Sequence, residues 1–409
     1  MGKLPKILVL GNYLPGSRDG GGVVRDEILK RYPKDRYICF SMNPSDKWDG
    51  VREIPESIRD IPCMIGPIVP HLRLRGARFY MPVLRAIGFH CISPWRVRQV
   101  VEFGRQHGVE LVWAELQYDA LLLAQEVAER LGVPLIGTIC DDLAGWFKDL
   151  RYYSFYYKIL QTRLRRALRS ARRLGTAGEA MQQAYLQEYG VSSLILRHGF
   201  ETPILSQKAS KGEDSITIGF VGSPYGRDAW MAFFSAIAHL NVSGKVPPIK
   251  LRVFGDGFPY QDDNVEIELK GWQPAELMLR EIAETSFCYL PYWFEPSKRR
   301  HVELSFANKF ETYLAAGRPV LFHGPAYAGI AETIKQYGVG LCVHSLDQDQ
   351  IIAALERLIL DSHLRESFSQ ASVSAFHAEF NARVMMKNFA ELIGVEPDIL
   401  TGEKGDKID

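Results

Sequence analysis

The chain of 409 residues is poor in cysteine, and its few cysteines are far apart. No two of them have the close spacing of zinc ligands or of the disulfide framework of a small secreted domain. The sequence therefore favours a reducing compartment and predicts no thiolate metal site. The six cysteines are Cys39, Cys63, Cys91, Cys140, Cys288 and Cys342.

Long uncharged apolar runs are also missing. No such run reaches the roughly 18 residues that span a bilayer. At the amino terminus, Lys3 and Lys6 lead directly into a short apolar strand, which is unlike a signal peptide. We therefore expect a cytoplasmic protein. With 46% hydrophobic and 24% charged residues the chain should fold, and we expect a flexible tail over residues 401–409.

The fingerprint of dinucleotide-binding proteins is absent as well. Glycines at 11, 16 and 20–22 follow the first predicted strand, but they do not form Gly-x-Gly-x-x-Gly, and no acidic residue ends the second strand. Both absences argue against a nicotinamide-dependent enzyme. The glycines still allow a ligand to approach the backbone closely, and Gly21 and Gly22 are the candidate contacts.

Apolar strands and helices alternate along the chain in two series. Such alternation predicts an α/β protein with doubly wound parallel sheets. The first series is predicted to have strands at Lys6–Leu10, Tyr37–Phe40, Glu110–Trp113, Pro134–Ile139 and Ser193–Leu196, with helices at Val23–Arg31, Arg98–Gln106, Ala120–Leu131 and Glu179–Tyr189. The second has strands at Ile216–Val221, Lys250–Phe254, Val265–Leu269, Phe287–Leu290, Val320–Phe322 and Leu341–Val343.

A polar stretch from Pro203 to Asp214 separates the two series. We therefore predict two Rossmann-like domains, residues 1–205 and 206–380, that face each other across a cleft at the carboxyl ends of their strands.

The segment from Leu304 to Phe322 contains the most specific motif of the chain. A polar loop runs into a short helix with Lys309 in its first turn, and the helix ends at Gly317 before Pro319 begins a strand. Unpaired backbone N–H groups at a helix start favour a phosphate, and Lys309 would add a positive charge. The motif predicts a site for a phosphorylated ligand.

This segment resembles the donor-site signature of retaining glycosyltransferases of the two-domain GT-B fold, family-4 type. The signature reads roughly Ser-Phe-Pro-(Ser/Asn)-Lys, then (Glu/Thr)-Tyr-Leu-Ala-Ala-Gly-(Lys/Arg)-Pro-Val. This chain has Ala307 in place of the proline. Glu303 and Glu311 have the spacing of the family's glutamate pair but lie one residue early, so Thr312 is preferred as the ribose ligand. The resemblance implies donor contacts from Ser305, Phe306, Ala307, Asn308, Lys309 and Thr312.

Three further motifs precede this segment in the order of the family. Phe220-Val-Gly-Ser-Pro-Tyr-Gly-Arg-Asp resembles the strand, turn and basic residue that reach the donor phosphates, which implies Gly222, Ser223 and Arg227. Val253-Phe-Gly-Asp-Gly257 resembles the family's Gly-Asp-Gly turn, at Gly255, and Lys270-Gly-Trp272 the segment beside the base, at Trp272. In family members the last helix returns to the first domain, and residues 381–400, with Ala382–Leu392, are the candidate.

Carboxylates after strands of the first domain are candidates for the acceptor site. Glu115, Asp119, Asp141 and Asp142 follow two of these strands, and one of them, with Asp142 as the catalytic candidate, would orient the acceptor hydroxyl. Helix-capping or solvated carboxylates are the alternative. Among the histidines, His90 and His198 are weaker candidates.

Basic residues are concentrated in two parts of a chain whose net charge is +1. Residues 61–101 hold six arginines and no acidic residue, and Arg151–Arg173 holds eight basic residues, none acidic, and five aromatic ones. This composition fits an anionic membrane face or a lipid diphosphate, with a solvated basic helix as the alternative. Nucleic acid is disfavoured because no nucleic-acid motif accompanies the charges.

The resemblance implies a glycosyltransferase that transfers a sugar from a nucleotide-diphosphate donor to a glycan or lipid-linked saccharide. Arg227 and Lys309 would neutralise the leaving diphosphate, so we expect neither a metal nor another cofactor. The protein would be cytoplasmic, or peripheral on the inner face of the membrane. A non-catalytic nucleotide-sugar-binding protein and a sugar-nucleotide epimerase of the same fold remain alternatives.

Overall fold

The computed structural model describes residues 4–11, 15, 20–41, 59–60, 94–142, 154–205 and 215–401. The chain forms two compact units. The first comprises Met1–Arg197 with Met385–Asp409, and the second comprises His198–Val384. The boundary after Arg197 lies a few residues before the predicted one at residue 205.

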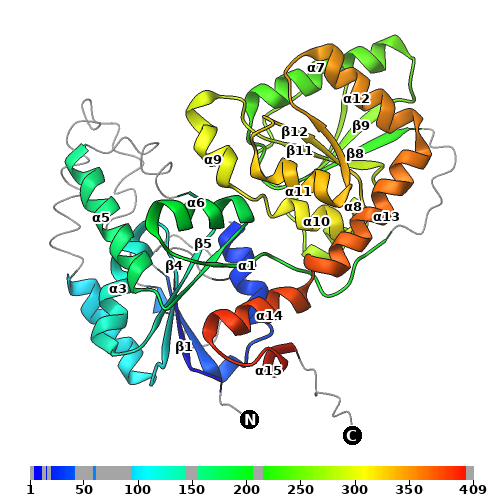
Figure 1. Ribbon diagram of the computed structural model, residues 1–409. Helices are drawn as coiled ribbons and strands as arrows, with labels where there is room; N and C mark the ends of the chain where they lie inside the picture. The colour runs from blue at the N-terminus through cyan, green and yellow to red at the C-terminus, as the bar shows by residue number, and fades with distance from the viewer. Residues whose placement is uncertain are drawn as a thin grey trace, which may run out of the picture. The chain divides into compact units, whose positions relative to one another are not determined.

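The first unit contains a parallel sheet with strand order β3-β2-β1-β4-β5-β6-β7. Helices cover both faces of this sheet (Figure 1). The order reverses direction between β1 and β4, as in doubly wound folds, and that point is where such sheets bind ligands. The strands are β1 Ile7–Gly11, β2 Tyr37–Ser41, β3 Arg59–Asp60, β4 Leu111–Glu115, β5 Leu135–Ile139, β6 Arg173–Thr176 and β7 Leu194–Ile195. The helices are α1 Gly20–Leu29, a helix over residues 94–106, α3 Tyr118–Leu131, α5 Ser154–Ser170 and α6 Glu179–Tyr189.

The second unit repeats this architecture with the order β10-β9-β8-β11-β12-β13, again entirely parallel. Its switch point lies between β8 and β11. The strands are β8 Ile216–Val221, β9 Ile249–Phe254, β10 Glu266–Gly271, β11 Phe287–Pro291, β12 Val320–His323 and β13 Gly340–Val343. The helices are α7 Arg227–Ser243, α8 Ala275–Ala283, α9 Arg299–Leu304, α10 Lys309–Ala315, α11 Gly329–Tyr337, α12 Gln348–Leu360, α13 Ser362–Glu379, α14 Ala382–Ile393 and α15 Asp398–Thr401. The last residues of α14, and α15, belong to the first unit.

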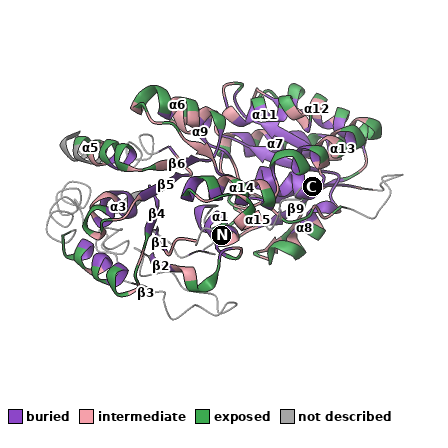
Figure 2. Ribbon diagram, turned by 60° about the horizontal axis from the view of Figure 1, so that its bottom comes forward, coloured by how far each residue is buried: buried purple, intermediate pink, exposed green. Residues whose placement is uncertain are grey.

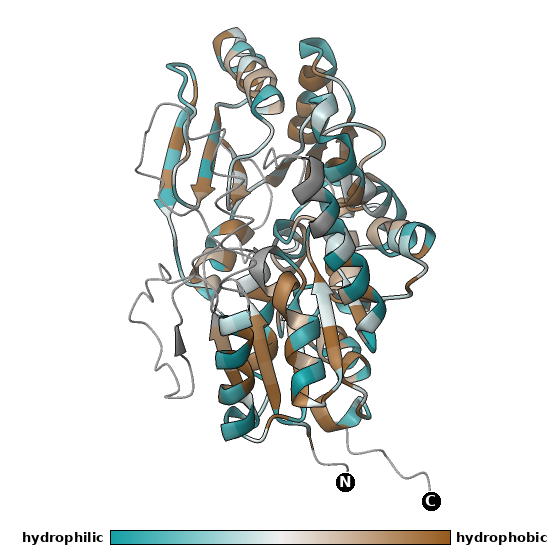
Figure 3. Cartoon of the chain, turned by 90° about the vertical axis from the view of Figure 1, so that its left-hand side faces the viewer, coloured by the Kyte–Doolittle hydropathy of each residue, from teal (hydrophilic) through white to brown (hydrophobic). Residues whose placement is uncertain are grey.

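The buried strands explain why the two series of apolar segments could be recognised. Parallel strands covered on both faces are apolar along their whole length, and β1, β4, β5 and β11 are buried at every position. Figure 2 shows the burial concentrated on the strands and on one side of each helix, and Figure 3 shows the strands of the first sheet largely in the hydrophobic colour. The predicted doubly wound parallel sheets are confirmed. The structure adds β3 and β6, which the sequence did not reveal.

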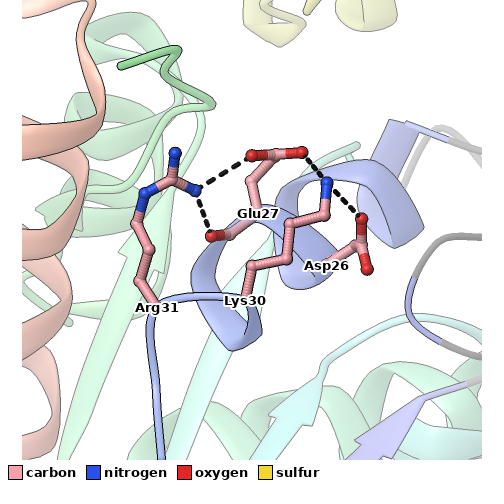
Figure 4. A network of polar contacts seen from close by, with 4 residues as sticks. All are labelled: Asp26, Glu27, Lys30 and Arg31. Atoms are coloured by element: carbon pink, nitrogen blue, oxygen red, sulfur yellow. Dashed lines mark hydrogen bonds and ion pairs between the residues drawn. The ribbon is translucent and has the colours of Figure 1, made fainter. Parts of the chain in front are cut away.

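Local charge pairs join the two residues that follow α1 to its last turns. Lys30 pairs with Asp26 at 2.9 Å and also with Glu27, and Arg31 pairs with Glu27 at 2.9 Å (Figure 4). Pairs of this spacing on one helix contribute about 0.3–0.5 kcal/mol each, so they support the helix without determining the fold.

The return of the last helix to the first unit is confirmed. Phe389 of α14 is fully buried, with its ring 6.1 Å from that of Tyr32 and 4.8 Å from that of Trp113. Asn388 donates to the Ile195 carbonyl at 3.0 Å, and Arg173 donates to the Glu391 carbonyl. The helix thus completes the core of the first unit.

Candidate functional site

Three glycines lie together where β8, β9 and β10 end. Gly222, Gly255 and Gly271 have φ angles of 84°, 135° and 64°, in the region that favours glycine. The Gly222 N–H donates to the Phe254 carbonyl at 2.7 Å, and the Gly255 N–H to the Gly271 carbonyl at 3.0 Å. A Cβ on Gly255 would lie 2.9 Å from the Gly222 oxygen. The next residue, Trp272, is 43% exposed. At these strand ends a ligand could therefore approach backbone that carries no side chains, beside the exposed indole of Trp272.

Lys309 reaches this cluster from another part of the chain. It begins α10, and its Nζ donates to the Ser223 carbonyl at 3.1 Å. Its Nζ and Cε both lie 3.9 Å from where a Cβ on Gly222 would be. The structure thus brings together three predicted donor-site residues, Gly222, Ser223 and Lys309.

Two aromatic rings enclose the Lys309 ammonium. The Nζ atom lies 4.2 Å from the ring centroid of Phe220 and 4.3 Å from that of Tyr225, and the residue is 8% exposed. Burial lowers the Lys309 pKa from 10.5 to about 7. The side chain is therefore close to half protonated at neutral pH, and an anion placed beside it would favour the charged form.

Tyr225 and Trp293 belong to this site, although the sequence analysis missed both. Tyr225 follows β8 and Trp293 follows β11, so their rings meet at the switch point of the sheet. They stack with centroids 4.5 Å apart and an interplanar angle of 20°. The signal that could have found them is the position of an aromatic residue just after each of these two strands.

The loop before α10 is fixed through its own side chains. Ser305 donates to the His301 carbonyl, and Tyr292 donates to the Ser305 carbonyl at 3.3 Å. Phe306 is 7% exposed, with its ring centroid 5.7 Å from that of Phe310 and 6.3 Å from that of Phe380. The Phe306 side chain thus anchors the loop in the core, and any donor contact at Phe306 or Ala307 would come from the backbone.

The first turns of α10 are buried. Thr312 is 5% exposed, and its hydroxyl lies 3.4 Å from the Asn308 carbonyl, to which it donates. Glu311 is fully buried, whereas Glu303 pairs with Arg299 at 2.7 Å. A ribose contact from Thr312 would have to replace the bond to Asn308, and this role stays a prediction.

Arg227 is the first residue of α7 and is exposed. It follows Gly226, whose φ of 76° turns the chain into the helix. Its positive charge opposes the rise that burial causes in the pKa of Tyr260. Arg227 makes no ion pair within the described part of the chain, so its guanidinium is available to an anion.

The acceptor candidates of the first unit lie in several environments. Glu115, at the end of β4, is 2% exposed and forms an ion pair with the equally buried Arg25. Asp142 is 1% exposed, and Asp141 accepts from Gln117 at 3.5 Å. Asp119 lies in the first turn of α3. An acceptor contact from Glu115 would compete with Arg25, and the acceptor roles stay predictions.

The structure locates some of the remaining candidates, whereas others lie outside the described residues. Gly21 and Gly22 lie in the first turn of α1 instead of the predicted loop, because the helix begins at Gly20. His198 is buried, with its ring 4.5 Å from that of Phe200. Outside the described residues lie His90 and most of the basic stretch 61–101.

The second basic stretch forms α5 and the residues that follow it. Lys158, Arg165, Arg166 and Arg169 are exposed, while the buried side of α5 carries Leu164, Ala167 and Leu168. The aromatic residues of this stretch, at 152, 153 and 155–157, lie outside the described side chains. Every helix among the described residues is too short or too polar to span a bilayer.

No group of three or more metal-ligating side chains occurs among the described residues. The chain does contain one Asp-x-Asp triplet, Asp347-Gln-Asp349. Asp347 caps α12 by accepting from the Gln350 N–H at 3.0 Å, so this aspartate has a structural role.

Part of this chain matches a known protein family, and its fold is similar to that of several solved structures. Residues 233–366, which include Lys309, match the family described as "Glucosyltransferase 3-like, C-terminal domain". No curated protein sequence matches the chain. Anabaena HepE in complex with UDP is 16% identical, with a TM-score of 0.65 over 95% of this chain and 99% of that one. WaaG, a glycosyltransferase involved in lipopolysaccharide biosynthesis, is 14% identical, with a TM-score of 0.61 over 97% of this chain and 100% of that one. The predicted GT-B fold is therefore confirmed.

Proposed function

We propose that this chain is a glycosyltransferase that transfers a sugar from a nucleoside-diphosphate sugar to a glycan or a lipid-linked saccharide. The observation that carries the proposal is the placement of Lys309 against the Gly222–Ser223 turn, within a domain that matches glucosyltransferases. Such a turn lets a diphosphate approach the backbone, while Lys309 and Arg227 supply the positive charge.

The chemistry that these residues can perform is electrostatic. When the bond between the sugar and the diphosphate breaks, negative charge develops on the leaving oxygen. The ammonium of Lys309 and the guanidinium of Arg227 would stabilise that charge, which is the role that a divalent cation has in other enzymes. We propose that the reaction needs no metal and retains the anomeric configuration, as the family resemblance implies.

The base and sugar of the donor are proposed from neighbours of the fold. HepE has been solved with UDP and with UDP-glucose. The exposed Trp272, next to Gly271 and Gly255, is suited to stack on a base. UDP-glucose is therefore the first donor to test.

The experiment is calorimetry of UDP-glucose with the full chain in buffer that contains a chelator. We expect binding without metal. Lys309→Ala and Arg227→Ala each remove a hydrogen bond to a charged group, worth about 1.5–3 kcal/mol, and should weaken binding roughly ten- to a hundredfold. Met231→Ala, on an exposed apolar position of α7, is the matched control. Binding that depends on magnesium, or parent-like affinity in both variants, would contradict the proposal.

Incubation of the enzyme with donor distinguishes the two alternatives. A non-catalytic binding protein would bind UDP-glucose but release no UDP with any candidate acceptor. An epimerase would convert the free donor to its epimer without an acceptor. A glycosyltransferase releases UDP at a rate that rises when the correct acceptor is added.

We further propose that the exposed basic side of α5 contacts an anionic membrane surface that carries the acceptor. Lys158, Arg165, Arg166 and Arg169 support this proposal because basic residues near an anionic leaflet contribute about 1 kcal/mol each. The protein would then be peripheral on the inner face of the membrane.

A further inference from the structure

Among the described residues, the ammonium of Lys309 has few polar neighbours. Of its three N–H groups, one has an acceptor in the Ser223 carbonyl at 3.1 Å. The ammonium also lies over the ring faces of Phe220 and Tyr225, with centroids at 4.2 and 4.3 Å. Ring faces attract a cation, but more weakly than water solvates it. The charged form of Lys309 is therefore undersolvated in this arrangement.

The Tyr225 ring is held in place from a second direction. It stacks on Trp293 with the centroids 4.5 Å apart, and it meets the Tyr292 ring edge to face at 5.8 Å. Trp293 is in turn supported by His301, with centroids 5.1 Å apart. Tyr225 thus forms a fixed wall between Lys309 and the loop after β11.

We propose that Tyr225 is a positioning residue for Lys309: its ring, held by Trp293, confines the ammonium at the Ser223 carbonyl and excludes water, so that binding of a nucleoside diphosphate is coupled to uptake of a proton by Lys309. The inference rests on the proposed function, because it assumes that the diphosphate binds beside Gly222. It adds a residue that the donor motif does not contain.

No neighbouring charge accounts for the lowered pKa of Lys309. Its pKa is lowered to about 7 by desolvation alone. Tyr225 faces it from the loop after β8, and Glu311 and Tyr313 share its helix, with Glu311 fully buried. The Tyr313 hydroxyl accepts from the Val221 N–H at 3.2 Å and donates to the Tyr289 carbonyl at 3.0 Å, and burial raises its pKa well above 10. On the neighbouring loops, Asp256 is exposed and the Tyr292 hydroxyl donates to Ser305.

A bound diphosphate places negative charge beside the ammonium, which has no anionic partner of its own among the described groups named above. It stabilises the protonated form, so the pKa of Lys309 should rise on binding. Above about pH 7, free enzyme must take up a proton when it binds, and affinity should fall by up to about tenfold per pH unit. Below that pH, Lys309 is already charged and affinity should be constant.

The experiment measures the affinity of the full chain for UDP-glucose from about pH 6 to about pH 8.5. UDP-glucose is the suitable probe because its diphosphate is doubly esterified and does not titrate in this range. The parent should lose about tenfold in affinity between about pH 7 and pH 8.5. In Tyr225→Ala, water reaches the ammonium, its pKa rises, and affinity should become nearly constant over this range. Tyr225→Phe keeps the ring face and should restore the parent profile.

Two further variants complete the design. Tyr327→Ala removes the ring beneath the exposed Arg299, where the cation lies 4.6 Å from the centroid, and should leave the profile unchanged. Trp293→Ala removes the support of Tyr225 and should shift the profile in the direction of Tyr225→Ala, which keeps the test decisive if Tyr225→Ala fails to fold. A parent-like profile in both Tyr225→Ala and Trp293→Ala, or a flat profile in the parent, overturns the inference while the proposed function stands.

A measurement without ligand separates the two proposals. In the free chain labelled at the lysine Cε, the resonance that disappears in Lys309→Met reports the titration of Lys309. We expect a midpoint near 7 in the parent and a higher one in Tyr225→Ala. An ordinary midpoint in the parent overturns the inference. A midpoint near 7 in a chain that binds no nucleotide sugar supports the role of Tyr225 in confining Lys309, but overturns the coupling to donor binding together with the proposed function.

Discussion

Burial disfavours the protonated, charged form of Lys309. A fully solvated lysine could attract a phosphate, but other anions and water molecules would compete for its ammonium. In this protein Lys309 is 8% exposed, and its ammonium lies between Phe220 and Tyr225. An anion that reaches it meets a charge in low dielectric, where the attraction is stronger. The buried charge lowers the free energy of unfolding at low pH, where Lys309 is protonated. The same burial favours the binding of an anion beside it.

The burial of Lys309 predicts a pH dependence of stability. Its pKa is about 7 in the folded chain, against an ordinary value of 10.5. Between these values the unfolded chain binds a proton that the folded chain does not, so this group makes the free energy of unfolding rise with pH, by at most about 1.4 kcal/mol per pH unit.

The Lys309→Met variant removes this contribution. We expect the parent to gain stability relative to Lys309→Met as the pH rises from about 7 to about 9, and the variant to be the more stable protein near pH 6. Urea denaturation at several pH values measures the difference. Parallel stability curves for the two proteins would show that Lys309 titrates normally.

Gly226 has two independent reasons to be glycine. Its φ of 76° is unfavourable for other residues, and an added Cβ would lie 2.9 Å from the Tyr292 carbonyl oxygen. Gly244, at the other end of α7, has a φ of 63° and open space around the same position. We expect Gly244→Ala to cost about 1 kcal/mol from backbone strain, and Gly226→Ala clearly more, with weaker nucleotide binding. Equal losses in urea denaturation would show that the contact with Tyr292 is easily relieved.

At the scale of elements, α7 is tied to the loop after β11. Asp228 accepts from the Phe294 N–H at 3.0 Å, and the Tyr289 hydroxyl lies 3.2 Å from the Ala229 carbonyl and 2.8 Å from Nδ1 of His323. Burial lowers the pKa of His323 to about 4, so the ring is neutral at physiological pH. This buried network fixes the start of α7, and with it Arg227, relative to the strands that carry the donor site.

The exposed basic residues of α5 predict a salt-sensitive association of the protein with anionic surfaces. Replacement of Lys158, Arg165, Arg166 and Arg169 by Gln should abolish co-sedimentation with phosphatidylglycerol vesicles at moderate salt, because exposed charges are screened over about 10 Å at 0.1 M. UDP-glucose binding should not change. A variant with four exposed basic residues of the second unit replaced, Lys245, Arg299, Lys335 and Arg357, is the control. If the parent does not sediment with the vesicles at low salt, α5 is a solvated helix and the acceptor is soluble.

At the scale of the whole molecule, the chain returns to its first unit through α14. Phe389 is fully buried against Tyr32 and Trp113. Phe389→Ala should therefore cost the first unit about 3–5 kcal/mol. Hydrogen exchange should become faster in β1 and β4 and stay unchanged in β8 of the second unit. Leu360→Ala, at a position 65% exposed, should change neither. Equal acceleration in both units would show that they unfold together.

The sequence alone determined the class of the fold and the location of the donor motif. Apolar strands of a parallel sheet are buried on both faces, so they stand out in the sequence, and Ile216–Val221 was predicted residue for residue. A short strand such as β6 escaped prediction because Arg173–Thr176 follows directly on a basic helix. Lys309 and the glycines after β8 and β9 could be found because they lie in local motifs.

Only the tertiary structure decided how these residues are solvated and what they touch. Nothing local shows that Phe220 and Tyr225 enclose an ammonium from a residue more than 80 positions away, or that Trp293 supports Tyr225. The same holds for Glu115, a predicted acceptor ligand, because its sequence position does not show the ion pair with Arg25 inside the first unit. Burial and pairing depend on the elements that the fold brings together, because desolvation is set by neighbours in space and not by neighbours in sequence.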